Sequence, residues 1–198
     1  MNETGRIEAF SDGVFAIAIT LLILEIKVPH ELPAGALGRY LLHDWPSYLA
    51  FLASFFTIGV MWMNHHRLFT LIGGANDVLI GLNLLLLLGV TWIPYPTALL
   101  AEHLTTANER VAAVVYAGSF FAISIVFQVL WRYAMRIEGI ILPECVVIAH
   151  SIHRQYRWGP LFYVIAILIG LFNGTACLIW SALLGIYFAL PPKLWASH

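Results

Sequence analysis

The stretch from Arg6 to Val28, RIEAFSDGVFAIAITLLILEIKV, limits the fold more than any other part of the chain. It is long and apolar enough to cross a bilayer as an α-helix, which takes about 20 residues. Its start nevertheless carries the polar residues Arg6, Ser11 and Asp12. An unpaired charge inside a membrane costs roughly 3 kcal/mol or more. The stretch therefore predicts a membrane-spanning helix with a functional or architectural polar site near its start.

One face of this predicted helix is a continuous apolar strip with Thr20 on its flank. At about 100° per residue, the strip consists of Phe10, Gly13, Ile17, Leu21, Leu24 and Val28. Spacings of three and four residues are typical of a helix that meets copies of itself around an axis. We therefore expect this helix to form the wall of an ion pore. Asp12 projects to nearly the opposite side, so its carboxylate should point into the subunit's own bundle.

The composition agrees with a membrane protein. Hydrophobic residues make up 61% of the chain and charged residues 11%, whereas soluble domains carry about 25% charged residues. The net charge of −1 offers no basic surface for nucleic acid. We find no soluble domain, and expect residues 1–198 to form a single transmembrane domain.

Apolar runs of spanning length predict six transmembrane helices, so the expected fold class is an all-α integral membrane protein. The predicted helices cover residues 6–28, 46–69, 77–100, 110–133, 158–173 and 175–190. Asn173-Gly174 is the turn between the last two, which should form a tight hairpin. Residues 29–44 predict an irregular outer connection. Residues 134–157 predict an amphipathic segment that lies along the inner membrane interface.

The distribution of Lys and Arg predicts the orientation, because basic residues accumulate on the cytoplasmic side. With a cytoplasmic N-terminus, the inside set is Arg6, Arg67, Arg132, Arg136, Arg154, Arg157 and Lys193. The outside set is Lys27, Arg39 and Arg110. Seven against three favours six spans with the N- and C-termini both in the cytoplasm.

The second helix ends in a group of polar side chains, Trp62-Met63-Asn64-His65-His66. Adjacent histidines diverge by about 100° on a helix, so they are poorly placed to share one metal ion. One interpretation is a hydrogen-bonded network in which Trp62, Asn64 and one imidazole satisfy Ser11 and Asp12, with Arg6 as a further partner of Asp12. The other is a solvated pair of interfacial histidines.

Thr20 also has two interpretations. Threonine in a membrane helix commonly donates a hydrogen bond to a backbone carbonyl one turn earlier. Its place beside the apolar strip also allows a ring of hydroxyl groups that offers oxygen to a partly dehydrated cation.

The order Arg-x-x-x-Phe-Ser-Asp, at Arg6, Phe10, Ser11 and Asp12, resembles the first helix of the endolysosomal potassium channel family, transmembrane protein 175, and its bacterial relatives. The resemblance extends to WMNHHRLF at residues 62–69 and to the Pro-x-Pro sequence that starts at Pro94. It implies a bacterial inner-membrane potassium channel that is a homotetramer, with one six-helix unit per subunit and the first helix around a central pore. It also implies a network between the Phe-Ser-Asp motif and the second helix, and a threonine at the place of Thr20.

In such a tetramer Ile17, Leu21 and Leu24 would form successive apolar rings that act as a hydrophobic gate by excluding water. The chain has no TVGYG-like filter sequence, so selectivity must come from side chains such as Thr20 or from the narrow ring. We expect K⁺ to permeate without any bound cofactor or fixed metal. Passage of other monovalent cations or of protons stays open.

A different function class stays open. A buried acid with histidines in reach is typical of a proton relay, so Asp12, His65 and His66 could serve a proton-permeable channel or a proton-coupled carrier or enzyme. No Ser-His-Asp arrangement or Gly-rich phosphate loop points to catalysis, so the expectation is a channel and not an enzyme.

Overall fold

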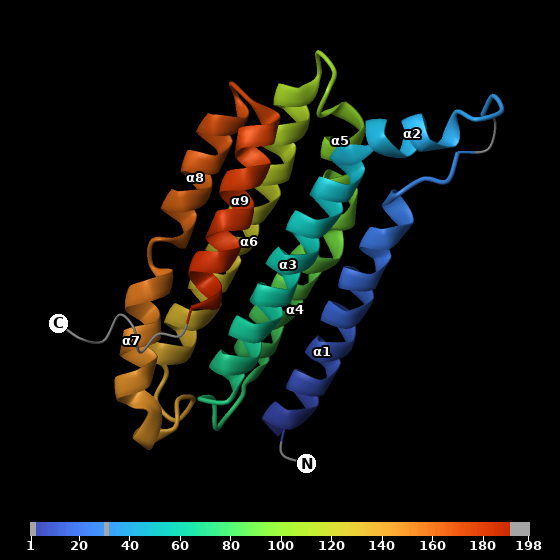
Figure 1. The fold of residues 1–198 in the computed structure, drawn as a ribbon. Coiled ribbons are helices and arrows are strands. Elements are labelled where there is room, and N and C mark those ends of the chain that lie inside the picture. The colour runs from blue at the N-terminus through green and yellow to red at the C-terminus, as the bar shows by residue number, and fades with distance from the viewer. Residues whose placement is uncertain (1–2, 30–31, 191–198) are drawn as a thin grey trace.

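The computed structural model describes residues 3–29 and 32–190 as a bundle of long, roughly aligned helices (Figure 1). In these ranges the only β-type pairing is an isolated antiparallel bridge between Ile72 and Ile141. The all-α prediction is therefore confirmed for the described part of the chain.

The first predicted helix is split in two. α1 covers Glu3–Leu21, and a short 3₁₀ helix, η1, continues over Leu22–Glu25. The chain is extended at Ile26, and Val28 is sterically biased against helix because it directly precedes Pro29. The expected end at residue 28 is thus several residues too late.

The outer connection is more ordered than predicted. It contains α2, Leu37–His43, which projects sideways from the bundle beyond α1 (Figure 1). α3 follows at once over Trp45–Phe69, with Pro46 at its start, where a missing N–H costs nothing. The expectation of an irregular connection is wrong for these residues, because LGRYLLH has a single glycine and no proline to interrupt a helix.

The third span is a pair of stacked helices, α4 over Asp77–Trp92 and α5 over Pro94–His103. The side chain of Asn76 accepts a hydrogen bond from Leu79 N at 3.0 Å and caps α4. The break at Ile93 comes directly before Pro94, which cannot donate to the preceding turn.

The remaining helices are α6, Glu109–Arg136; η2, Pro143–Cys145; α7, Val146–Tyr156; α8, Gly159–Gly170; and α9, Gly174–Ala189. The expected turn between α8 and α9 is present. Asn173 caps α9 by accepting a hydrogen bond from Ala176 N at 2.7 Å.

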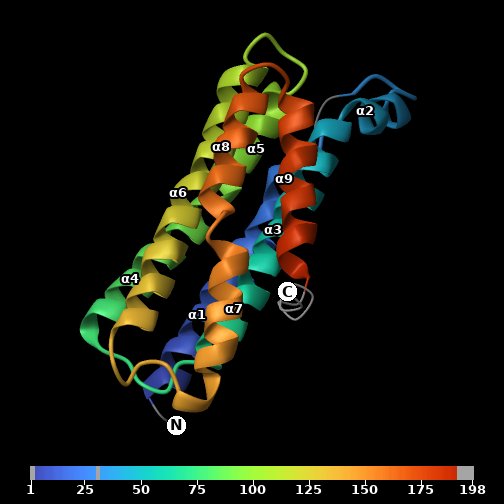
Figure 2. The same cartoon turned by 90° about the vertical axis from the view of Figure 1, so that its left-hand side faces the viewer.

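α7 differs from its expected position along the membrane interface. It stands beneath α8 and runs beside the end of α6 (Figure 2). Its apolar face explains this, because Ala149, Ile152 and Tyr156 are buried against the bundle instead of facing a lipid surface.

Four helical segments are long and apolar enough to cross a membrane, namely residues 4–25, 45–69, 77–103 and 109–136. α8 and α9 are apolar but have only 12 and 16 residues. Four of the six expected spans therefore have the required length in the described chain, while the crossing by α8 and α9 stays a prediction.

The bundle core is built on close helix approaches. α4 meets α6 at Gly89, where an added Cβ would lie 2.7 Å from Ile123 Cγ1. Trp131, Tyr116 and Phe120 of α6 are among the largest fully buried side chains. α6 therefore contributes several of the largest side chains of the core, whereas α1 lies at one edge of the bundle, at the right in Figure 1.

Candidate functional site

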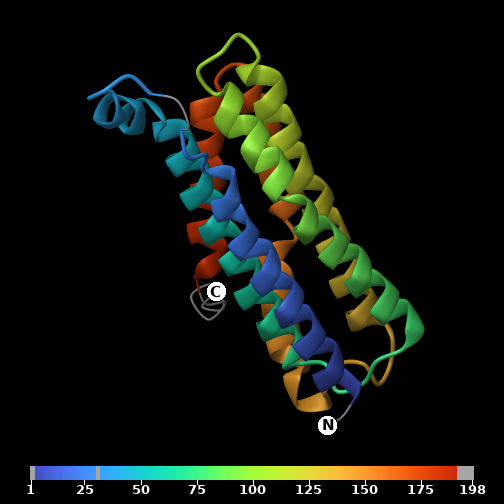
Figure 3. The same ribbon diagram turned by 90° about the vertical axis from the view of Figure 1, so that its right-hand side faces the viewer.

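The apolar strip of α1 and η1 is exposed in the subunit. Ile17 keeps 60% of its surface accessible, and the other side chains of the strip, Phe10, Leu21, Leu24 and Val28, are exposed as well. α1 passes across the front of the bundle in Figure 3, so its outer face has no neighbour within the subunit. This agrees with the strip as the surface that other subunits would meet.

The opposite face of α1 is buried against α3 and α4. Its buried residues are Ser11, Phe15, Ala18 and Leu22, which follow one another at helical spacings of four, three and four. The sequence predicted that Asp12 projects to nearly the opposite side from the strip and into the bundle. Asp12 is instead half-buried at its edge, about 100° away from Ser11.

Asp12 is held by α3. Trp62 Nε1 donates a hydrogen bond of 2.7 Å to Asp12 Oδ1. Beside this contact lies a groove of about 340 Å³ between the two helices, lined by Asp12, Phe15, Ala16, Ile19, Ile58, Gly59 and Trp62. The carboxylate therefore has one strong donor and stays accessible from the groove.

Ser11 belongs to a second, separate chain of hydrogen bonds. Its hydroxyl donates to Ile7 O at 2.8 Å, so its oxygen accepts from Asn83 Nδ2 at 2.9 Å. Asn83 Oδ1 then faces His65 Nε2 at 2.8 Å and must accept from it. This order places a proton on His65 Nε2.

His65 is enclosed by aromatic rings. Its ring stacks on Phe69 with centroids 4.3 Å apart and lies 5.4 Å from Phe15. In the described chain, its Nδ1 is buried and has no hydrogen-bond partner. His66 points elsewhere and pairs with Glu8 at the helix surface. The two adjacent histidines thus have unrelated environments, as their divergence on a helix requires.

Two expected members of the network lie outside it. Arg6 is exposed, and the described residues contain no ion pair between Arg6 and Asp12. Six residues separate them, which places the side chains about 9 Å apart along α1 and on different faces. The expectation of an Arg6–Asp12 pair within one subunit is therefore wrong.

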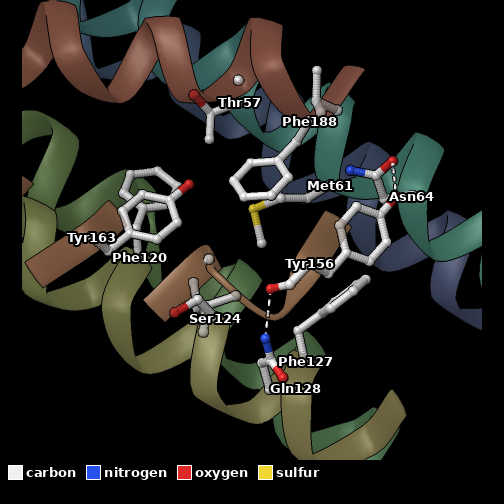
Figure 4. A pocket seen from close by; sticks show the side chains of 14 residues that line it. Thr57, Met61, Asn64, Phe120, Ser124, Phe127, Gln128, Tyr156, Tyr163 and Phe188 are labelled. Atoms are coloured by element: carbon white, nitrogen blue, oxygen red, sulfur yellow. Dashed lines mark hydrogen bonds between the residues drawn. The ribbon is translucent and has the colours of Figure 1, made fainter. Parts of the chain in front are cut away.

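Asn64 faces away from α1. Its Oδ1 accepts from the Tyr156 hydroxyl at 2.7 Å and from Arg67 Nη1 at 3.1 Å. It lies on the wall of a cavity of about 70 Å³ between α3, α6 and α9, beside Tyr156 and Met61 (Figure 4). The role that the sequence assigned to Asn64 falls to Asn83, a lone amide in the apolar run of α4.

Thr20 donates a hydrogen bond to the backbone one turn earlier, as the first of its two interpretations requires; we call this contact the back-bond. Its hydroxyl lies 2.9 Å from both Ala16 O and Ile17 O. The side chain is exposed on the same side of α1 as Ile17. A hydroxyl that donates backwards still presents its oxygen lone pairs outwards, so both interpretations are compatible with this geometry.

Comparison with known proteins links these features to one family. The family model described as "Endosomal/lysosomal potassium channel TMEM175" matches residues 6–94. A Chamaesiphon minutus protein named potassium channel Cha6605_3372 is 50% identical over 194 residues, which cover 96% of this chain and 95% of that protein. The chicken (Gallus gallus) endosomal/lysosomal proton channel TMEM175 is 35% identical over 66% of this chain, but the match covers only 28% of the chicken protein.

The fold agrees with these matches. The crystal structure of a lysosomal potassium-selective channel TMEM175 homolog from Chamaesiphon minutus superposes with a TM-score of 0.88 and 49% identity. The superposition covers 98% of this chain and 100% of that one. The chain is therefore a multi-pass, all-α membrane protein that belongs to the TMEM175 family.

Proposed function

We propose that this chain forms a potassium-permeable cation channel in which α1 of four identical subunits surrounds a central pore. The single observation that carries the proposal is the exposed apolar strip of α1, whose opposite face buries Ser11, Phe15 and Ala18. The strip also includes Gly13, a small residue of the kind that allows helices to approach closely in a membrane. One subunit offers only one such strip, so a pore requires several copies.

The proposed gate consists of Ile17, Leu21 and Leu24. These side chains are exposed in the subunit, and four copies at one level would give rings that hold no oxygen atoms for an ion. A narrow apolar ring excludes water and so blocks conduction. Thr20, on the adjacent flank, is the proposed source of oxygen for selectivity.

Asp12, Ser11, Trp62, His65 and Asn83 have an architectural role in this proposal. They hold α1 against α3 and α4 through the two hydrogen-bonded chains described above. The chains do not join in the described residues, since no hydrogen bond links Asp12 to His65. This weakens a proton relay through these groups and favours the channel.

The proposed orientation places both termini in the cytoplasm of a bacterial cell, with the chain in the inner membrane as one domain of six crossings. The first turns of α1 carry Arg6 and the last turns of α3 and α6 carry Arg67, Arg132 and Arg136, and these helix ends lie at the lower end of the bundle in Figure 1. α7, which holds Arg154 and precedes Arg157, lies toward the same end. Lys27 follows η1, while Arg39 belongs to α2 and Arg110 to the first turn of α6, and these elements lie toward the opposite end. Lys193 lies outside the described residues.

Planar bilayers with the purified protein under asymmetric K⁺ and Na⁺ test the function. We expect unitary currents whose reversal potential lies near the K⁺ equilibrium value. Flux that saturates without unitary steps would instead indicate a carrier or an enzyme. A reversal potential that follows an imposed pH gradient would favour the proton-permeable alternative.

A further inference from the structure

Six basic side chains gather where the last turns of α6 run beside α7 and its junction with α8. Arg132 and Arg136 belong to the last turns of α6, and the others lie on α7 and at its junction with α8. We call this group the basic patch, and it consists of Arg132, Arg136, His150, His153, Arg154 and Arg157. The proposed pore and the polar network of α1 use none of them.

The two helices present these side chains in register. Gln128 Nε2 donates to Tyr156 O, which fixes the level at which α6 passes the end of α7. α6 and α7 run in opposite directions (Figure 2). One turn beyond Gln128 along α6 is Arg132, and one turn back along α7 is His153. A further turn brings Arg136 level with His150.

Electrostatics agree with this register. Burial lowers the pKa of His153 from its ordinary value, and the neighbouring charges of Arg132, Arg157 and His150 lower it further. The part of this lowering that comes from Arg132, Arg157 and His150 shows that positive charges lie close to the His153 ring. The patch therefore favours an added negative charge.

The described part of the chain supplies no such negative charge through an ion pair. Within residues 3–29 and 32–190, no ion pair involves any arginine of the basic patch. Glu138 and Glu144, in the connection between α6 and α7, are exposed and make no such pair. The guanidinium groups of Arg132, Arg136 and Arg154 are exposed and available to a ligand.

The patch borders the apolar surface of the bundle. The guanidinium of Arg157 lies 4.8 Å from the ring centroid of Trp158, which is 45% exposed. Directly beyond it, α8 carries the exposed side chains Leu161 and Leu168. Tryptophan prefers the headgroup level of a membrane, so the arginines lie where phospholipid phosphates are found.

We propose that the basic patch binds the phosphate headgroup of an anionic phospholipid, whose acyl chains lie along α8. Guanidinium groups recognise phosphate oxygens through paired N–H donors, and basic pockets between membrane helices bind anionic headgroups. A soluble phosphate ester has the same headgroup chemistry but lacks the acyl chains. The inference needs only that the bundle crosses a membrane, so it is independent of the proposed channel activity.

The test is the thermal unfolding midpoint of the purified full-length protein in mixed micelles that contain phosphatidylglycerol or phosphatidylcholine. We expect phosphatidylglycerol to raise the midpoint and phosphatidylcholine to have little effect. Each basic residue near a membrane surface contributes about fivefold in affinity for anionic lipid. The double variant Arg132→Gln/Arg157→Gln should therefore need roughly 25-fold more phosphatidylglycerol for half of the effect.

Two further variants serve as controls. Arg39→Gln/Arg110→Gln removes two arginines from the opposite end of the bundle and should keep the wild-type response. Arg132→Lys/Arg157→Lys keeps the positive charge and should retain most of the wild-type response to phosphatidylglycerol. If the glutamine variant does not fold, the wild-type response to phosphatidylglycerol is measured at increasing salt concentration. The response should become smaller, because salt screens exposed charges.

Three results would overturn the proposal. The first is an equal response to phosphatidylglycerol in the wild type and in the folded glutamine variant. The second is a wild-type response that salt leaves unchanged. The third is a rise in the unfolding midpoint with glycerol phosphate that equals the rise with phosphatidylglycerol, which would identify a site for soluble phosphate esters.

Discussion

Trp62 Nε1 donates a 2.7 Å hydrogen bond to Oδ1 of Asp12, and this contact joins the last third of α3 to the middle of α1. It is the direct link between the Phe-Ser-Asp motif and the Trp-Met-Asn-His-His segment. Because Asp12 lies at the edge of the packed face and not inside it, its loss should loosen the attachment of α1 without emptying the core.

Asp12→Ala and Trp62→Phe should therefore have similar effects on stability. A hydrogen bond to a charged group contributes about 1.5–3 kcal/mol, and each substitution removes the same bond. The measurement is the unfolding midpoint of each variant and of the double variant, together with the yield of assembled oligomer. We expect the double variant to be little worse than either single one. Additive losses would show that the two side chains act independently, and a stable Asp12→Ala channel with altered ion preference would place Asp12 in the pore.

Asn83→Leu should destabilise the subunit by about 1–3 kcal/mol, because it leaves the buried Nε2–H of His65 without an acceptor. The leucine side chain is close in volume, so lost packing contributes little. Leu85→Ala is the matched control on α4, since Leu85 is exposed and should tolerate truncation. Equal stability of the Asn83→Leu protein and the wild type would show that the Ser11–Asn83–His65 chain does not hold α1 in place.

Ile17→Asn should raise the potassium current, because an amide wets an apolar ring that otherwise excludes water. Ile17→Met should lower it by adding bulk at the same level. The assembly should survive both changes, since Ile17 is 60% exposed and packs against no helix of its own subunit. Flux and oligomer stability are measured on the same preparation. A destabilised, non-conducting Ile17→Asn protein would instead mean that Ile17 is buried between subunits, where an unpaired amide is costly.

Thr20→Val should reduce the preference for K⁺ over Na⁺ while the oligomer stays intact, if the hydroxyl oxygen meets the ion. Valine has nearly the same shape, and the lost back-bond to Ala16 O leaves no buried group unpaired, because Thr20 is exposed. The reversal potential under mixed K⁺ and Na⁺ is the measurement. An unchanged value would leave Thr20 with the back-bond alone.

Much of the fold follows from the sequence by itself. The lengths of the apolar runs located the long helices, because a backbone in lipid must satisfy its hydrogen bonds within a helix. The 3.6-residue period separated the exposed strip of α1 from its packed face. Asn173-Gly174 marked the α8–α9 turn. Each of these features depends on residues near one another in the chain.

The polar contacts depended on the tertiary structure. The sequence offered Trp62, Asn64 and His65 as equal donors to α1, but neighbouring residues on a helix point about 100° apart. The rotation of α3 decided that Trp62 meets Asp12, whereas Asn64 meets Tyr156. Asn83 was visible as a lone amide in an apolar run, but nothing in its neighbourhood named Ser11 and His65 as its partners.

The position of α7 was decided in the same way. Its sequence is amphipathic, and such a helix can cover either a lipid surface or the side of a bundle. The choice depends on whether an apolar surface of matching shape is free nearby, and Phe127 of α6 and Phe188 of α9 provide one for Tyr156. Periodicity determines which residues of a helix share a face, but only packing against other helices determines what that face meets.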